Sequence, residues 1–149
     1  ALTMPCARTA ALLIGVIIPA VAAAQATSPP TLNCVRGFDG LKATAQELPD
    51  AQWTEKDGYD IATLSAPERW VARIAFTRPG HPAHPAVTLR TRRKQVTEVW
   101  TADSKGCGYG DPSQFSLLMA DMKSADAALT NASRIEVERR KADRPPLAP

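Results

Sequence analysis

The stretch Trp70-Val-Ala-Arg-Ile-Ala-Phe76 decides the fold, because its apolar side chains recur at every second residue. Side chains at that spacing share one face of an extended chain, so the apolar residues from Trp70 to Phe76 would be buried together while Arg73 points the other way. The stretch therefore predicts a strand with one buried and one polar face, as is typical of an antiparallel sheet.

Turn signals bound this strand on its N-terminal side. Asp57-Gly58 is a strong two-residue hairpin signal, and side chains alternate again over residues 59–64. We therefore expect a hairpin over residues 53–64 that leads into the strand at residues 70–76. A short helix is expected over residues 41–48, where Pro49 would stop it.

Further strands are expected on the C-terminal side. Residues 87–91 and 96–101 are rich in β-branched and alternating side chains, so they predict two strands joined by Arg92-Arg93-Lys94. Three glycines in residues 105–110 predict a turn.

A helix is expected from residue 112 to about residue 128. Asp111 is a natural N-cap and Pro112 suits the first helical position. Residues 133–138 are compatible with either an edge strand or a short helix. The apolar residues after Pro112 have the i, i+3, i+4, i+7 spacing of an amphipathic helix: Phe115, Leu118, Met119 and Met122.

These elements predict an α+β domain, an antiparallel meander of four to six strands with one principal C-terminal helix packed on one face. The apolar stripe of the helix would form one side of the core. The strands would form the other side through Trp70, Ile74, Phe76, Val87 and Leu89.

The first 26 residues predict a cleavable secretory signal peptide. Arg8 is their only charged residue, an apolar run follows over residues 10–23, and the small residues Ala24 and Ala26 end the segment. The run is shorter than the ~18–20 residues needed to cross a bilayer, so no transmembrane anchor is expected after cleavage. Cleavage after Ala24 and cleavage after Ala26 both satisfy the small-residue rule. The expected organisation is a signal at 1–26, a linker at 27–33, one globular domain at 34–140 and a disordered tail at 141–149.

Cys34 and Cys107 remain after cleavage, and we expect them to form a disulfide. An oxidising compartment, an even count and the absence of metal-ligand spacing favour this pairing over a reactive thiol. The bridge would stabilise the mature domain, whose apolar content is lower once the signal peptide is removed.

His81 and His84 lie in the most distinctive loop of the chain, Pro-Gly-His-Pro-Ala-His-Pro at residues 79–85. Two imidazoles three residues apart in a proline-rich loop are candidate metal ligands, although no adjacent residue supplies a third. An exposed structural loop and a contact for a partner are the other interpretations. The longer stretch Phe76-Thr-Arg-Pro-Gly-His-Pro-Ala-His-Pro-Ala86 resembles one found in small exported proteobacterial proteins of uncharacterised function. The resemblance implies an envelope or extracellular protein and brings no catalytic role.

Charge is unevenly distributed along the chain. Residues 39–60 carry a net charge of −4 and residues 68–94 a net charge of +6. We expect binding of an anionic partner, either an envelope component or an acidic protein. A solvated sheet face, balanced by the acidic segment, is the alternative. Arg90 and Arg92 would share a strand face, near Arg73 if the strands pair antiparallel. The candidate partner-binding residues are Arg73, Arg90, Arg92 and Arg93.

The sequence carries none of the common catalytic motifs, such as the nucleophile elbow, the zinc-protease helix or the phosphate-binding loops. We therefore expect a non-enzymatic binding or accessory protein, periplasmic or secreted, with no cofactor. Nucleic-acid binding is not expected, because the chain is predicted to be exported and contains few aromatic residues. Two alternatives stay open: a periplasmic metal-binding protein that uses His81 and His84, and a small secreted hydrolase, for example with Cys107 as nucleophile.

Overall fold

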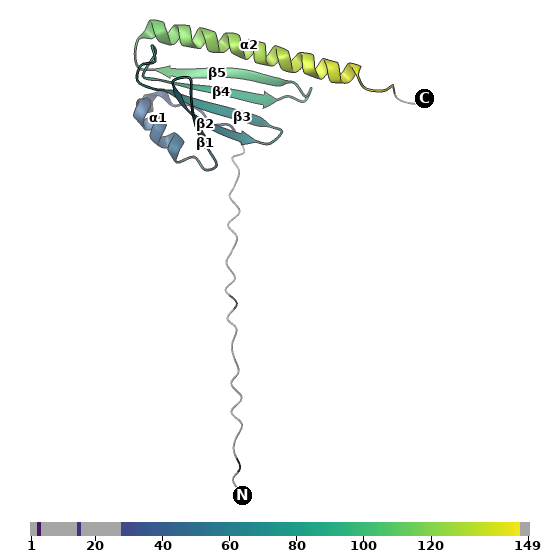
Figure 1. The fold of residues 1–149 in the computed structure, drawn as a ribbon, viewed down its shortest axis with the longest axis horizontal. Coiled ribbons are helices and arrows are strands. Elements are labelled where there is room, and N and C mark those ends of the chain that lie inside the picture. Colours follow the sequence, from purple (N-terminus) through teal and green to yellow (C-terminus); the bar gives the residue numbers. More distant parts are fainter. Residues whose placement is uncertain (1–2, 4–14, 16–27, 147–149) are drawn as a thin grey trace.

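The computed structural model describes residues 28–146 and the isolated positions 3 and 15. The fold is α+β, as predicted: five antiparallel strands form one sheet in the order β1-β2-β3-β4-β5, and a long C-terminal helix packs along it (Figure 1). The strands are β1 (Gln52–Lys56), β2 (Tyr59–Ala66), β3 (Trp70–Thr77), β4 (Ala86–Lys94) and β5 (Trp100–Gly108). The helical elements are the 3-10 turn η1 (Cys34–Arg36), α1 (Gly37–Gln46) and α2 (Pro112–Ala142).

The hairpin expected around Asp57-Gly58 is confirmed. Both residues have positive φ angles, 53° and 82°, which the primed two-residue hairpin turns require. The turn pairs Lys56 with Tyr59 and sets the register of β1 on β2. Because side chains alternate along a strand, this register also determines which residues face each side of the sheet.

One face of the sheet, here called the α1 face, carries the hydrophobic core. Phe76 of β3 is fully buried there, with its ring edge-on to Phe38 of α1 at 5.8 Å and stacked on Trp53 of β1 at 5.9 Å. The other buried members of this core are Leu41, Ala45, Ala62, Leu64, Ala66, Trp70, Ala72, Ile74, Val87, Leu89 and Cys107.

The prediction that the C-terminal helix covers this core is wrong. The predicted strand residues from Trp70 to Leu89 are buried as expected, but they pack against α1. The apolar stripe of α2 lies on the opposite face, where Phe115 and Met119 approach β5. Figure 1 shows α2 running along β5, with α1 toward β1 and β2. We call this second side of the sheet the α2 face.

The predicted turn at residues 105–110 is also wrong, because β5 continues to Gly108. A Cβ atom at Gly106 would lie 2.7 Å from Met119 Sδ, and one at Gly108 would lie 2.5 Å from Phe115 Cγ. Glycine is therefore needed here for the close approach of a helix to a strand, a role that glycine takes inside sheets.

β4 ends later and β5 begins later than predicted. Residues 92–94 belong to β4, and the chain turns at residues 95–99, where Gln95 N–H donates to Val99 O at 2.8 Å. Val96, expected in a strand, is fully exposed in this turn, and Glu98 has a φ of 73°. Only residues 100–101 of the second predicted strand are in β5.

α2 begins as predicted and runs further than predicted. The Asp111 carboxylate accepts hydrogen bonds from the backbone N–H groups of Ser113 and Gln114. The helix continues through residues 133–138 to Ala142, and its C-terminal part extends beyond the ends of the strands (Figure 1). No helix in the described part of the chain is long and apolar enough to span a membrane.

α2 also covers the outer edge of β5. Thr130 Oγ1 accepts a hydrogen bond from the Ala102 N–H at 3.0 Å, and Ser133 Oγ accepts one from the Trp100 N–H at 2.8 Å. An edge strand with free N–H groups is a template for pairing with another chain, so these side chains close that edge.

A disulfide joins Cys34 of η1 to Cys107 of β5, as predicted, with the two Cα atoms 5.4 Å apart. It holds the segment that precedes α1 against the sheet, and the Tyr109 hydroxyl donates to Cys34 O at 2.7 Å. Residues 147–149 and most of the predicted signal peptide at residues 1–26 lie outside the described residues.

Candidate functional site

The charged side chains that the first four strands place on the α2 face are all basic. The alternation of side chains along each strand, with the observed register, sorts the charges by face. The acidic residues within the strands, Glu55, Asp60 and Asp103, alternate onto the α1 face. The basic residues on the α2 face are Lys56, Arg73, Arg90, Arg92 and Lys94.

Arg90 is neutralised by α2. Its Nε donates to Asp126 Oδ1 at 2.7 Å, and its Nη2 donates to Met122 O at 3.2 Å. Asp126 is buried and also accepts from the Ser104 hydroxyl at 2.8 Å. Because both partners are largely removed from water and hydrogen-bonded, this contact holds α2 to the sheet and leaves little charge for a ligand.

Arg92 and Lys94 are engaged in internal contacts as well. The Arg92 guanidinium lies 5.9 Å from the centre of the Trp100 ring, at a distance typical of a cation–π contact. Lys94 donates to the Glu68 carboxylate in the turn between β2 and β3. Lys94 is therefore paired, whereas Arg92 has no ion pair among the described residues and its Nε is buried without a hydrogen-bond partner.

Arg73 is the exposed one among the predicted arginines of this face. It lies directly opposite Arg90 across β3 and β4, as the antiparallel pairing predicted. Its side chain is exposed, and it has no ion pair among the residues that the structure describes. Arg93 is exposed on the opposite face of the sheet, across from Trp70, so the structure separates it from the other three.

A groove of about 180 Å³ lies beside Arg73, between α2 and the sheet. Apolar side chains of both layers form part of its wall, and Tyr59, Arg73, Thr88 and Arg90 are its polar members. Its lining residues are Tyr59, Ile61, Arg73, Ala75, Thr88, Arg90, Leu118 and Met122.

Tyr59 adds a neutral hydroxyl to this groove. Burial, and then the negative charge of Asp121 on α2, raise the pKa of its phenol above the usual value. Its Oη lies 2.8 Å from His81 Nε2. Both effects favour the neutral, protonated form of the hydroxyl.

A larger depression of about 710 Å³ lies along the outer flank of α2 and β5. It is shallow, and its charged lining mixes Asp103 and Asp126 with Lys123 and Arg134. Mixed charge gives no preference for the sign of a ligand, so the smaller groove beside Arg73 is the better candidate site.

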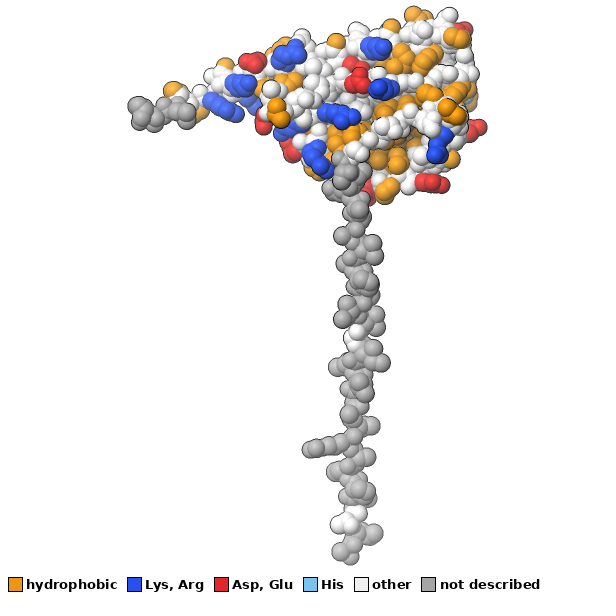
Figure 2. All heavy atoms as spheres, turned by 180° about the vertical axis from the view of Figure 1, so that it is seen from behind, with side chains coloured by type: hydrophobic (Ala, Val, Ile, Leu, Met, Phe, Trp, Pro, Cys, Tyr) orange, Lys and Arg blue, Asp and Glu red, His pale blue; other side chains and the backbone are white. Residues whose placement is uncertain are grey.

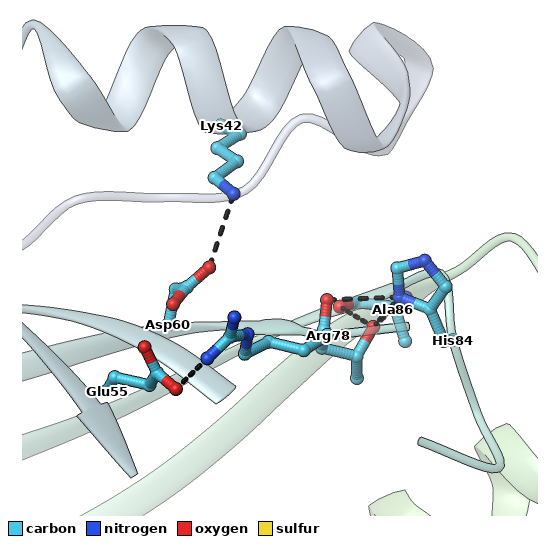
Figure 3. Close-up of polar contacts among 7 residues, drawn as sticks. Lys42, Glu55, Asp60, Arg78, His84 and Ala86 are labelled. Atoms are coloured by element: carbon cyan, nitrogen blue, oxygen red, sulfur yellow. Dashed lines mark hydrogen bonds and ion pairs between the residues drawn. The ribbon is translucent and has the colours of Figure 1, made fainter. Parts of the chain in front are cut away.

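The two histidines of the proline-rich loop are engaged separately. His81 Nδ1 accepts from the Ala83 N–H at 3.0 Å, so in the neutral ring its Nε2–H donates to Tyr59. His84 Nδ1 donates to Thr77 O at 3.0 Å (Figure 3). The His84 ring also lies edge-on to Phe38. The His81 ring thus has no free lone pair for a metal in this arrangement.

No group of three or more candidate metal ligands occurs among the described residues. His84 retains one nitrogen, Nε2, outside these contacts, but one imidazole is far short of a metal site. The metal-binding alternative therefore gains no support from the geometry and stays a prediction. The hydrolase alternative loses its thiol version, because Cys107 is in the disulfide.

The acidic segment of residues 39–60 is partly neutralised within the fold. Lys42 of α1 reaches Asp60 of β2 at 3.3 Å, and Arg78 pairs with Glu55 of β1 (Figure 3). Figure 2, seen from behind Figure 1, shows Lys and Arg side chains interspersed with acidic and hydrophobic ones. That side of the molecule therefore has no single basic patch.

The α2 residues of the site were not anticipated as site residues. Leu118 and Met122 belong to the predicted apolar stripe, and they border the groove because the helix covers only one side of the sheet face. A signal for Asp126 was present, since it lies four residues after Met122 and continues the stripe with a carboxylate. Comparisons with protein-family models, curated proteins and solved structures found no match.

Proposed function

We propose that this chain is an exported, non-enzymatic binding domain that holds an anionic partner on the part of the α2 face not covered by α2. We call this part the open face, and the observation that carries the proposal is the exposed Arg73 beside an apolar groove. The open face includes the side chains of Thr54, Lys56, Ile61, Thr63, Val71, Arg73 and Ala75, of which Lys56 and Arg73 are exposed cations.

Two features support a binding role over a purely structural one. Of the other basic side chains on the β3 and β4 part of this face, Arg90 and Lys94 are held by Asp126 and Glu68 and Arg92 lies against the Trp100 ring, whereas Arg73 is exposed and has no ion pair in the described residues. An exposed cation at the rim of an apolar groove favours the binding of a ligand that has both a negative charge and an apolar part.

Export rests on the N-terminal segment and agrees with the disulfide, because disulfides persist in oxidising compartments. Expression of the full chain with a C-terminal tag in a bacterial host tests this part. We expect tagged protein in the periplasm or medium, with an N-terminus at Gln25 or Thr27. Uncleaved protein confined to the cytoplasm would contradict export.

The binding part is tested with the oxidised full chain and fluorescently labelled polyglutamate at low salt. Arg73→Glu should weaken binding several-fold, and added salt should weaken binding to the wild type, because exposed charges are screened. Arg93→Glu is the matched control, an exposed arginine on the neighbouring strand but on the opposite face. Equal losses in the two variants would show that only net charge matters and would remove the open face as the site.

A further inference from the structure

We infer that the open face receives an acidic amphipathic helix of a partner protein, which lies beside α2 with its apolar side chains in the groove. This inference rests on the proposed function and names the partner's chemistry. It is carried by three independent observations: the width of sheet that α2 leaves uncovered, the composition of the groove, and the sign of the charges around it.

The sheet has room for one more helix on the α2 face. Strands lie about 4.8 Å apart, so the axes of β1 and β5 are separated by roughly 19 Å. A helix with side chains is about 10–12 Å across. Because α2 packs chiefly against β5, the uncovered strands β1 to β3 offer the width of a second helix.

The groove has the apolar surface that such a helix would contact. Leu118 and Met122, one turn apart, form its wall on α2, and Ile61 and Ala75 form its wall on the sheet. All four side chains are half-buried in the domain alone, so added contacts would remove further apolar surface from water. This is the usual arrangement in which a helix places apolar residues at i, i+3 and i+4 into a hydrophobic groove.

The size of the groove favours a macromolecule over a small ligand. Sites that enclose a small molecule measure about 300–1,000 Å³, whereas this groove measures about 180 Å³. Such a volume fits one anchoring side chain, while the remainder of a helix would cover the neighbouring surface and exclude water from it. A free fatty acid would leave much of its chain in solvent here.

The charges around the groove select acidic residues on the partner. Arg73 lies between Val71 and Ala75 along β3, and the strands place no acidic side chain on this face. Two carboxylates of α2 lie nearby: Asp126 is paired with Arg90, and the charge of Asp121 acts on Tyr59. A carboxylate of the partner would therefore be placed at Arg73, away from Asp121, where it could form a charge-assisted hydrogen bond.

The experiment is a selection from a displayed library of helix-forming peptides, with surface positions randomised, against the oxidised full chain. We expect recovered peptides to carry Asp or Glu next to an i, i+3, i+4 apolar pattern. Arg73→Glu and Ala75→Trp, which fills the groove, should each weaken their affinity about tenfold or more. Arg93→Glu should change the affinity about twofold at most, as is typical of a remote exposed charge. Far-ultraviolet circular dichroism and thermal melting check that Ala75→Trp is folded. If Ala75→Trp does not fold, Arg73→Glu, which changes an exposed side chain, tests the inference alone.

Several results would overturn the inference. One is recovery of no peptide, another is recovery of peptides without the acidic amphipathic pattern, and a third is equal affinity for the wild type and Arg73→Glu. Binding of dodecanoate or of phosphatidylglycerol vesicles with loss in Arg73→Glu, while the peptides fail, would replace the helix by a lipid. Replacement of the helix by a lipid would leave the proposed function standing. If Arg73→Glu and Arg93→Glu weaken polyglutamate binding equally, the proposed function and this inference both fail.

Discussion

The ion pair between Glu68 and Lys94 joins the turn after β2 to the end of β4. The hydrogen bond from Lys94, and then its positive charge, hold the pKa of the Glu68 carboxyl below its usual value. A carboxylate with a lowered pKa contributes stability above the unfolded-state pKa, and the contribution is lost as the pH falls through the folded-state pKa. The pair therefore weakens in acid.

We predict that Lys94→Met raises the pKa of the Glu68 carboxyl toward its usual value, as measured by nuclear magnetic resonance titration. Lys94→Arg is the control, because it keeps the positive charge and should keep the pKa lowered. Added salt should also raise the pKa of the Glu68 carboxyl toward its usual value, because both side chains of this pair are near the surface and their attraction is screened. An unchanged Glu68 titration in Lys94→Met would show that another group lowers the pKa.

The arginines show which features of the candidate site could be predicted from the sequence. The proximity of Arg73 and Arg90 followed from strand alternation and antiparallel pairing, which are local rules, and it is confirmed. The neutralisation of Arg90 did not follow, because its partner Asp126 is 36 residues further along the chain and on another element. Which cation remains free is therefore a property of the tertiary structure.

Among the elements, β5 and α2 are matched through two glycines. Phe115 lies over Gly108, where a Cβ atom would come within 2.5 Å of Cγ, the ring atom attached to the Phe115 Cβ. Cγ can move away only through a change in χ1 of Phe115 or a shift of the helix backbone. We predict that Gly108→Ala lowers the free energy of unfolding by about 1–3 kcal/mol, the usual cost of overpacking, as measured by urea denaturation.

A double-mutant cycle with Phe115→Ala is the control for this prediction. If the cost arises from the close contact, Gly108→Ala should be much less destabilising in the Phe115→Ala background, so the two changes should not add. Gly106→Ala is expected to be milder than Gly108→Ala, because its nearest atom is the flexible end of Met119. Full additivity in the cycle would show that backbone propensity, rather than the contact, sets the cost.

The same pair explains why the last strand was misplaced in the sequence interpretation. Three glycines in residues 105–110 favour a turn on local grounds, and only the approach of α2 explains two of them inside a strand. The Asp57-Gly58 hairpin was predictable because a two-residue turn depends on its own φ angles. Local rules thus identify tight turns better than they identify glycines that serve long-range packing.

In the whole molecule, the sheet separates two packing layers with different roles. The buried alternation along β2, β3 and β4 correctly predicted which residues are in the core. It could not say which helix covers them, because α1 and α2 are both able to pack on a sheet face. As a result the core lies under α1, and α2 instead builds the wall of the open face.

The disulfide stabilises the layer that contains α1. Cys34 precedes α1 and Cys107 is in β5, and the bond closes a loop with a sequence separation of 73 residues. By restricting the unfolded chain, a loop of that length is worth about 4 kcal/mol in the chain-entropy account. We predict that replacing both cysteines by serine lowers the free energy of unfolding by about that amount, as measured by denaturant unfolding of the oxidised full chain.

Reductant provides the internal control for this prediction. Dithiothreitol should lower the denaturation midpoint of the wild type toward that of the double serine variant and leave the variant unchanged. The Tyr109 hydroxyl also donates to Cys34 O, so Tyr109→Phe should cost about 1 kcal/mol in the oxidised protein. A wild-type midpoint that is the same with and without reductant would contradict a stabilising role for the bridge.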